Sequence, residues 1–136
     1  MSVWVIFIVA FLVFAFVIAA MVFWRERKWK RFYPEEENYI RSHWVRVIDS
    51  FHAYPAQAVM DADKILDYAL SRKGVNGSLG EKLKRAGHHF SDENGIWKAH
   101  KFRNRLAHEL MSPRLDEAKY ALAEYKRALN DLGANL

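Results

Sequence analysis

Residues 1–24 form an uncharged, apolar run, and no other stretch constrains the chain so strongly. At about 1.5 Å per residue in an α-helix, the segment from Trp4 to Trp24 extends roughly 30 Å, the thickness of the hydrocarbon core of a bilayer. The two tryptophans stand at its ends, where membrane-spanning helices carry aromatic belts. The run therefore predicts a single transmembrane helix surrounded by membrane lipid.

Basic residues follow this run directly and predict its orientation. A juxtamembrane segment, residues 25–34, contains five basic side chains and one acidic one. Basic residues mark the cytoplasmic ends of membrane helices, so we expect a single-pass protein of the inner (cytoplasmic) membrane with a cytoplasmic C-terminal domain. Anionic headgroups would contribute about 1 kcal/mol for each basic residue near the surface. These residues are Arg25, Arg27, Lys28, Lys30 and Arg31.

A cleaved secretory signal is the competing interpretation of the N-terminal run. Such a signal places basic residues before a shorter apolar core and small residues at the cleavage site. Here the basic residues come after the core, and only Ala19 and Ala20 resemble a cleavage site. We therefore expect the anchor to be retained.

Residues 35–136 leave room for one small domain with a modest core. From residue 34 onward the chain has 16 Lys and Arg and 15 Asp and Glu, so most of its net charge of +5 lies in the juxtamembrane segment. We do not interpret that segment as a nucleic-acid-binding patch. The absence of cysteine excludes disulfides and thiolate metal sites.

The domain shows the patterns of successive helices. Pro34, followed by three glutamates, is typical of a helix start. Pro55 either kinks the first helix or begins a second one, which Gly74 would end. The apolar residues of the first helix recur at helical spacing. They are Tyr39, Ile40, Trp44, Val47, Ile48 and Phe51.

The second half of the domain continues the helical pattern. Residues 74–80 contain three glycines but lack the preceding strand and the Lys-Ser/Thr pair of a phosphate loop, so they predict a turn. Ser78 and Glu81 have the spacing of a capping box that opens a short helix ending near Phe90. Ser91 is expected to cap a helix over residues 92–111, and residues 112–113 to start the last one. With no strand pattern, the sequence predicts an all-α domain, a bundle of four or five helices.

The helix over residues 92–111 carries the candidate site. His100, Asn104 and His108 are each four residues apart and form a polar stripe beside the face expected to lie in the core. Arg103 falls within that apolar face, where an unpaired guanidinium is costly. It could pair with a carboxylate of a neighbouring helix, or act with His108 to hold a phosphodiester. The expected core residues are Ile96, Ala99, Phe102, Leu106, Ala107 and Leu110; the candidate carboxylates are Asp61, Asp63 and Asp67.

Residues 103–108, RNRLAH, resemble the motif of HEPN domains (higher eukaryotes and prokaryotes nucleotide-binding), in which an arginine and a polar residue precede a histidine by a few positions. The wider stretch IWKAHKFRNRLAHE resembles small bacterial HEPN-like proteins, and the resemblance covers roughly residues 35–130. It implies a metal-independent endoribonuclease with paired domains. His108 would be the general acid or base, Arg103 would stabilise the phosphorane, and Asn104 would orient the site.

The residues around the candidate site carry a net positive charge. Between residues 81 and 105 there are seven basic and three acidic side chains, a patch that could track an RNA backbone or simply be a solvated face. On this patch His100, Lys101 and Arg105 are the expected substrate contacts. The residues predict no metal site and no cofactor.

Two function classes remain open from the sequence. One is a membrane-anchored ribonuclease of toxin or defence type that acts on cytoplasmic RNA. The other is a noncatalytic helical module that uses the same helix for dimerisation or for a partner. Because membrane anchoring raises the effective concentration of the domain, we expect a homodimer through the helix that carries His100, Asn104 and His108.

Overall fold

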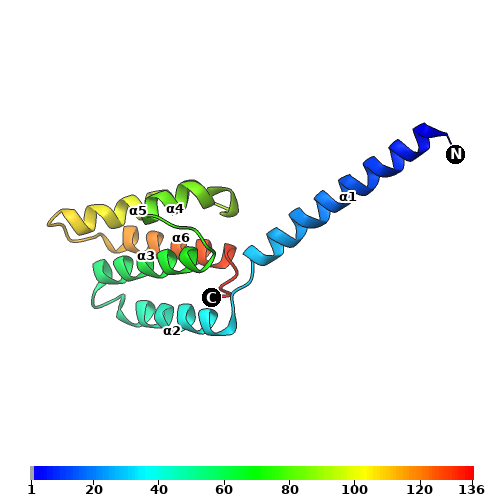
Figure 1. Ribbon diagram of the computed structural model, residues 1–136. Coiled ribbons are helices and arrows are strands. Elements are labelled where there is room, and N and C mark those ends of the chain that lie inside the picture. The colour runs from blue at the N-terminus through cyan, green and yellow to red at the C-terminus, as the bar shows by residue number, and fades with distance from the viewer. Residues whose placement is uncertain (1) are drawn as a thin grey trace. The chain divides into compact units, whose positions relative to one another are not determined.

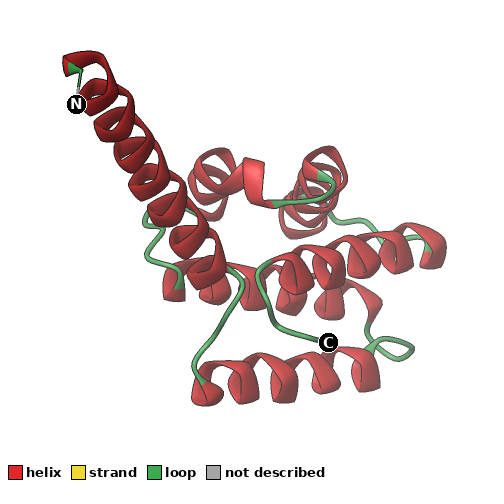
Figure 2. Cartoon of the chain, turned by 90° about the vertical axis from the view of Figure 1, so that its right-hand side faces the viewer, coloured by secondary structure: helices red, strands yellow, loops and turns green. Residues whose placement is uncertain are grey.

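The computed structural model describes residues 2–136, and that part of the chain is all-α, with helices joined by loops and no strand (Figure 1, Figure 2). The chain divides into two units, one containing the residues up to Lys30 and the other Arg31–Leu136. The second unit contains five α-helices and one short 3-10 helix. The all-α prediction is therefore confirmed.

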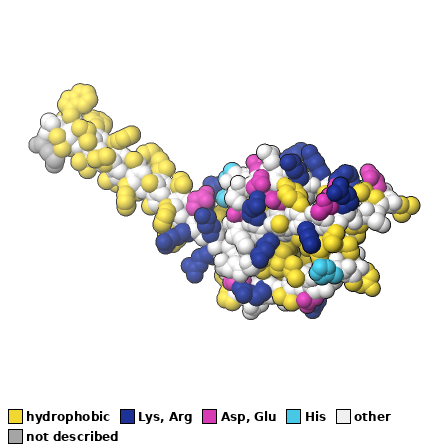
Figure 3. Space-filling model, turned by 180° about the vertical axis from the view of Figure 1, so that it is seen from behind, with side chains coloured by type: hydrophobic (Ala, Val, Ile, Leu, Met, Phe, Trp, Pro, Cys, Tyr) yellow, Lys and Arg dark blue, Asp and Glu magenta, His cyan; other side chains and the backbone are white. Residues whose placement is uncertain are grey.

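Helix α1, Val3–Trp29, is long and apolar enough to cross a membrane. None of its side chains is buried by the rest of the chain. Figure 3 shows hydrophobic side chains along its length and Lys and Arg side chains at its C-terminal end. The helix continues beyond residue 24, so most of the basic juxtamembrane residues extend the same helix rather than forming a separate linker.

Helices α2, Pro34–Ser50, and α3, Pro55–Arg72, each begin with proline at the first helical turn. A new helix thus starts at Pro55, after a turn, and the alternative of one kinked helix is wrong. Helix α2 packs mainly against α3 and buries one narrow stripe. Tyr39 and Ile48, predicted to belong to that stripe, are 42% and 49% exposed because they lie on its borders. The buried residues of α2 are Glu36, Ile40, Trp44 and Val47, and Phe51, directly after the helix, is buried as well.

Residues Arg31 and Phe32 are attached to the C-terminal end of α3. The Lys73 ammonium donates a hydrogen bond to the Arg31 carbonyl oxygen at 2.6 Å and lies 3.8 Å from the centre of the Phe32 ring. Partial burial lowers the pKa of Lys73 from 10.5 to about 8. Next to it, Arg72 Nε donates to Glu36 Oε1 at 2.6 Å, which joins α3 to the first turn of α2.

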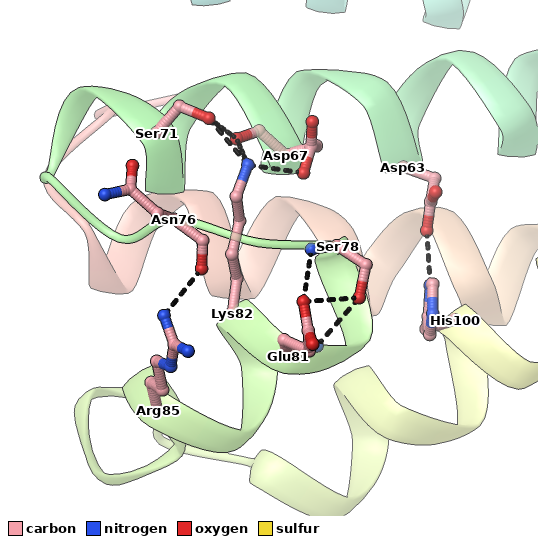
Figure 4. A network of polar contacts seen from close by, with 9 residues as sticks. All are labelled: Asp63, Asp67, Ser71, Asn76, Ser78, Glu81, Lys82, Arg85 and His100. Atoms are coloured by element: carbon pink, nitrogen blue, oxygen red, sulfur yellow. Dashed lines mark hydrogen bonds and ion pairs between the residues drawn. The ribbon is translucent and has the colours of Figure 1, made fainter.

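Helix α4, Leu79–Ala86, opens with the predicted capping box. Ser78 N donates to Glu81 Oε2 at 2.8 Å, and the Ser78 hydroxyl oxygen accepts from Glu81 N (Figure 4). The helix is shorter than the predicted one, which was expected to end near Phe90, because residues Gly87–His89 form the separate 3-10 helix η1. Buried Lys82 fastens α4 to α3 by donating to the Asp67 carboxylate at 2.7 Å and to Ser71 Oγ at 2.6 Å.

Helix α5, Glu93–His108, differs from the prediction at both ends. Asp92, not Ser91, caps it by accepting a hydrogen bond from Gly95 N, whereas the Ser91 hydroxyl donates to Asp131. At the other end the backbone turns extended after His108. Ala107 and Leu110 were both predicted to lie in the core, but both are exposed. Ala107 is in the last turn of α5, and Leu110 is fully exposed in the connection formed by residues 109–114.

Helix α6, Leu115–Asp131, packs against both α3 and α5. It starts two residues later than predicted, and Leu115 is about half exposed. Its buried stripe includes Ala118, Leu122, Tyr125 and Leu129. Since α3 also contacts α5, these three helices surround a common interior, and the candidate site lies on its edge.

Candidate functional site

A buried carboxylate, Asp63 of α3, is the centre of a polar network. The side chain is almost completely enclosed, with 4% of the residue exposed. Its Oδ1 accepts hydrogen bonds from the Tyr125 hydroxyl at 2.7 Å and from His100 Nδ1 at 2.8 Å, the second of which Figure 4 shows. Its Oδ2 lies 3.2 Å from Arg103 Nε. Asp63 thus joins α3 to α5 and α6.

Arg103 pairs with this carboxylate mainly through charge. Its Nε is buried, and although it lies within ion-pair distance of Asp63 it is not aligned for a hydrogen bond. The other end of the guanidinium reaches the surface, so that the side chain is 26% exposed. Of the two alternatives for Arg103, pairing with a carboxylate of a neighbouring helix is present in the structure.

His100 and Asn104 extend the network along one edge of α5. Arg103 Nη1 donates to Asn104 Oδ1 at 3.0 Å, which leaves the amide nitrogen directed at His100 Nε2, 3.3 Å away. Nε2 must therefore accept, and the imidazole proton belongs on Nδ1, from which it is donated to Asp63. With one tautomer, both ring nitrogens are satisfied within the chain.

The Tyr125 hydroxyl closes the network from α6. The residue is fully buried, and burial together with the adjacent negative charge of Asp63 raises its pKa well above 10.0. A buried tyrosine usually finds a partner for its hydroxyl. The apolar stripe of the last helix placed Tyr125 in the core, but that stripe alone did not identify a polar partner.

An open groove of about 510 Å³ lies on the solvent side of this network. One wall is formed by His100, Arg103 and Asn104 of α5, and the opposite wall by α3 and by residues 77–80, which lead from the turn into the start of α4. Two carboxylates and two cations line it, and the carboxylate of Asp67 is already paired with Lys82. The groove is therefore close to electrically balanced. The sequence predicted a turn near these residues, but it did not indicate that residues 77–80 would line the candidate site. The lining charges are Asp63, Asp67, Lys64 and Arg103.

The structure separates the predicted site residues into three places. His100, Arg103 and Asn104 come together at the groove. His108 does not line it and is exposed at the last residue of α5. Lys101 and Arg105 lie on the other side of α5, where they line a second cavity of about 600 Å³ between α5 and α6.

The second cavity, here called the α5–α6 cavity, has an apolar floor and charged edges. Ala99, Phe102 and Ala121 lie in its floor. Basic residues border it on α5 and acidic residues on α6, with Tyr120 beside the latter. The bordering charges are Lys98, Lys101, Arg105, Asp116 and Glu117.

The predicted basic patch is smaller than its composition indicates. Lys82 and Arg103 form ion pairs with carboxylates of the same chain, and Arg85 donates to the Asn76 carbonyl oxygen at 2.8 Å. Among residues 2–136, no group of three His, Asp or Glu side chains comes together as a metal site. The side chains at the groove can donate and accept hydrogen bonds and could transfer a proton.

Comparisons of the chain with known protein families, with curated proteins and with solved structures find no match.

Proposed function

We propose that the protein is a membrane-tethered, noncatalytic helical binding module, anchored by α1 with its domain on the cytoplasmic side. One observation carries the choice of a module over an enzyme: Arg103, Asn104 and His100 are held within a network of the chain itself, centred on buried Asp63. These contacts give His100, Arg103 and Asn104 a structural role within the chain. A role in binding then belongs to the surfaces around the network.

The position of His108 also supports the module. The resemblance to HEPN domains gives His108 and Arg103 a joint task, which requires both side chains to reach one phosphodiester. In this chain Arg103 lines the groove and His108 does not. The near balance of charge along the groove likewise offers little attraction to a polyanion such as RNA.

A HEPN-like, metal-independent endoribonuclease is the second candidate, and a specific observation favours it. Asp63 fixes the Nδ1 proton of His100 and leaves Nε2 as the acceptor near the groove, 3.9 Å from where a side chain on Gly80 would begin. A carboxylate-oriented imidazole beside an arginine is an arrangement suited to proton transfer and charge stabilisation. In that case His100, rather than His108, would transfer the proton.

One experiment separates the two candidates. The purified full-length protein and its His100→Ala and His108→Ala variants are incubated with RNA in EDTA, and the thermal unfolding of each is recorded. For the module we expect no cleavage by any of them. We also expect a loss of about 1–3 kcal/mol of stability in His100→Ala, because the buried Asp63 loses a donor, and no comparable loss in His108→Ala.

The ribonuclease predicts a different pattern. The unmodified protein would cleave RNA in EDTA, and His100→Ala would lower the rate by about 100-fold or more at a temperature where it remains folded. Cleavage that depends on His108 but not on His100 would instead favour the role implied by the HEPN motif. Any cleavage that survives repurification and disappears in one of these variants contradicts the noncatalytic module.

A further inference from the structure

The α5–α6 cavity carries charges that the chain itself leaves unpaired. Lys98 and Lys101 on one edge and Glu117 on the other form no ion pair within the described chain. Asp116 pairs with Arg114 at 2.8 Å and accepts a hydrogen bond from Glu117 N at 3.0 Å, and the side chains of Asp116 and Arg114 are both largely exposed. The cavity therefore combines an apolar floor with a basic edge and an acidic edge that are both free to meet other groups.

We infer that a second copy of this chain docks on the α5–α6 cavity, with the basic α5 edge of each copy against the acidic α6 edge of the other. This inference rests on the proposed binding function and names its partner. A two-fold axis through the cavity exchanges the two edges, so that a surface with opposite charges on its two sides is complementary to itself. Exposed Tyr120 lies at the same border, and aromatic side chains are enriched in protein interfaces.

The charge distribution selects a second copy over other occupants. RNA would meet the basic edge but would be repelled by Asp116 and Glu117. An uncharged apolar segment would fill the floor and leave charged side chains partly dehydrated without partners. A second copy supplies both signs in the required places. A homodimer was expected through the helix that carries His100, Asn104 and His108; the inferred contact uses that helix, but by the side of α5 away from the groove.

Membrane anchoring makes a weak contact of this kind effective. Chains anchored by α1 diffuse in one plane, which raises their local concentration relative to free domains. An interface built from a modest apolar floor and four or five charges can then be populated. Because the charges lie at exposed edges, added salt should weaken the association.

The test is complementation between two charge-reversed variants. The full-length protein is placed in lipid vesicles at fixed density, and association is measured by energy transfer between labelled copies. Lys101→Glu alone places two carboxylates against each other at each contact, and Glu117→Lys alone places two ammonium groups there. We expect each variant by itself to associate at least about 10-fold more weakly than the unmodified chain.

A mixture of the two variants should recover association to within about threefold of the unmodified chain, a difference below 1 kcal/mol. In a mixed pair the glutamate introduced at position 101 of one copy meets the lysine introduced at position 117 of the other, and at the second contact the native Glu117 of the first copy meets the native Lys101 of the second. A contact within one chain cannot produce this recovery. Lys126→Glu is the matched control, because Lys126 is exposed on α6 outside the cavity and undergoes the same charge change; it should associate normally.

Three results would overturn the inference: an unmodified chain that stays monomeric in vesicles, variants that associate as well as the unmodified chain, or a mixture that fails to recover. Thermal unfolding of each variant checks that the fold is retained. If Glu117→Lys unfolds, Glu117→Gln replaces it, with a smaller but still measurable weakening expected. Failure here leaves the noncatalytic module standing with another partner, whereas cleavage of RNA in EDTA would remove the module itself.

Discussion

The two hollows on either side of α5 contain similar residue types and use them in opposite ways. In the groove, His100 and Arg103 are bound to Asp63 of the same chain. At the α5–α6 cavity, Lys101 and Glu117 form no ion pair with any residue among 2–136. The difference lies in burial, since Asp63 is enclosed, whereas Lys101 is exposed and Glu117 is only half-buried.

This difference shows what a polar motif on a helix does and does not establish. Buried polar groups must be satisfied, so they acquire partners from neighbouring helices and become part of the fold. Exposed charges are satisfied by water and remain available to a partner. Substitutions on the two sides of α5 should therefore differ in kind: those at the groove lower stability, and those at the cavity alter association.

The largest effect should come from Asp63→Ala. Its removal leaves the Arg103 guanidinium without its counter-ion and takes the shared acceptor from His100 and Tyr125, so we expect a loss of about 3–5 kcal/mol in the free energy of unfolding. Glu117→Ala at the cavity is the matched control and should stay within about 0.5 kcal/mol. Denaturant unfolding of both variants in the same detergent measures the contrast. Equal losses in the two variants would show that burial does not distinguish the hollows.

A smaller effect is expected from Tyr125→Phe. This substitution keeps the ring in the core and removes only the hydroxyl that donates to Asp63, which should cost about 1 kcal/mol. Tyr120→Phe removes the hydroxyl of the half-exposed tyrosine at the cavity and should leave stability nearly unchanged. If both tyrosines tolerate the loss equally, the hydrogen bond at Asp63 contributes nothing measurable.

The smallest effect concerns alkaline pH. Because the pKa of Tyr125 is raised well above 10.0 in the folded protein, the unfolded chain loses this proton first as pH rises. The contribution of Tyr125 to stability should therefore be fully present well below pH 10 and decrease as the pH rises through 10, with about 0.4 kcal/mol already lost at pH 10. The difference between the unmodified chain and Tyr125→Phe, measured from pH 8 to pH 10, isolates this contribution. A parallel pH dependence in the two would contradict the raised pKa.

Much of the helical architecture follows from local sequence. Prolines at the first turns of α2 and α3 and the capping box of α4 are short-range features, and they were predictable because the atoms involved lie within one turn. The end of α5 was not. Apolar spacing continues through Ala107 and Leu110, but both residues are exposed, and periodicity alone does not show where the packing against neighbouring helices stops.

The residues of the site that lie on α5 were predictable, but their partners on the neighbouring helices were only partly so. Helical spacing placed His100 and Asn104 on one edge, whereas the partner carboxylate stayed one of three candidates. The sequence did contain a basis for choosing: Asp63 is four residues after Val59 and three before Leu66, on the buried face of α3, while Asp61 and Asp67 fall outside it. The separation of His108 from the groove depends on how α3, α4 and α5 pack, which no local pattern encodes.

The connection between α5 and α6 has a consequence for how the chain would respond to a protease. Residues 109–114 lie outside any helix, and Leu110 is fully exposed there, so this segment offers an accessible cleavage point. A cut would release no fragment under native conditions, because α6 keeps its buried stripe against α3 and α5 and Tyr125 keeps its bond to Asp63. The nicked protein would migrate as one species in native gels and as two polypeptides only after denaturation.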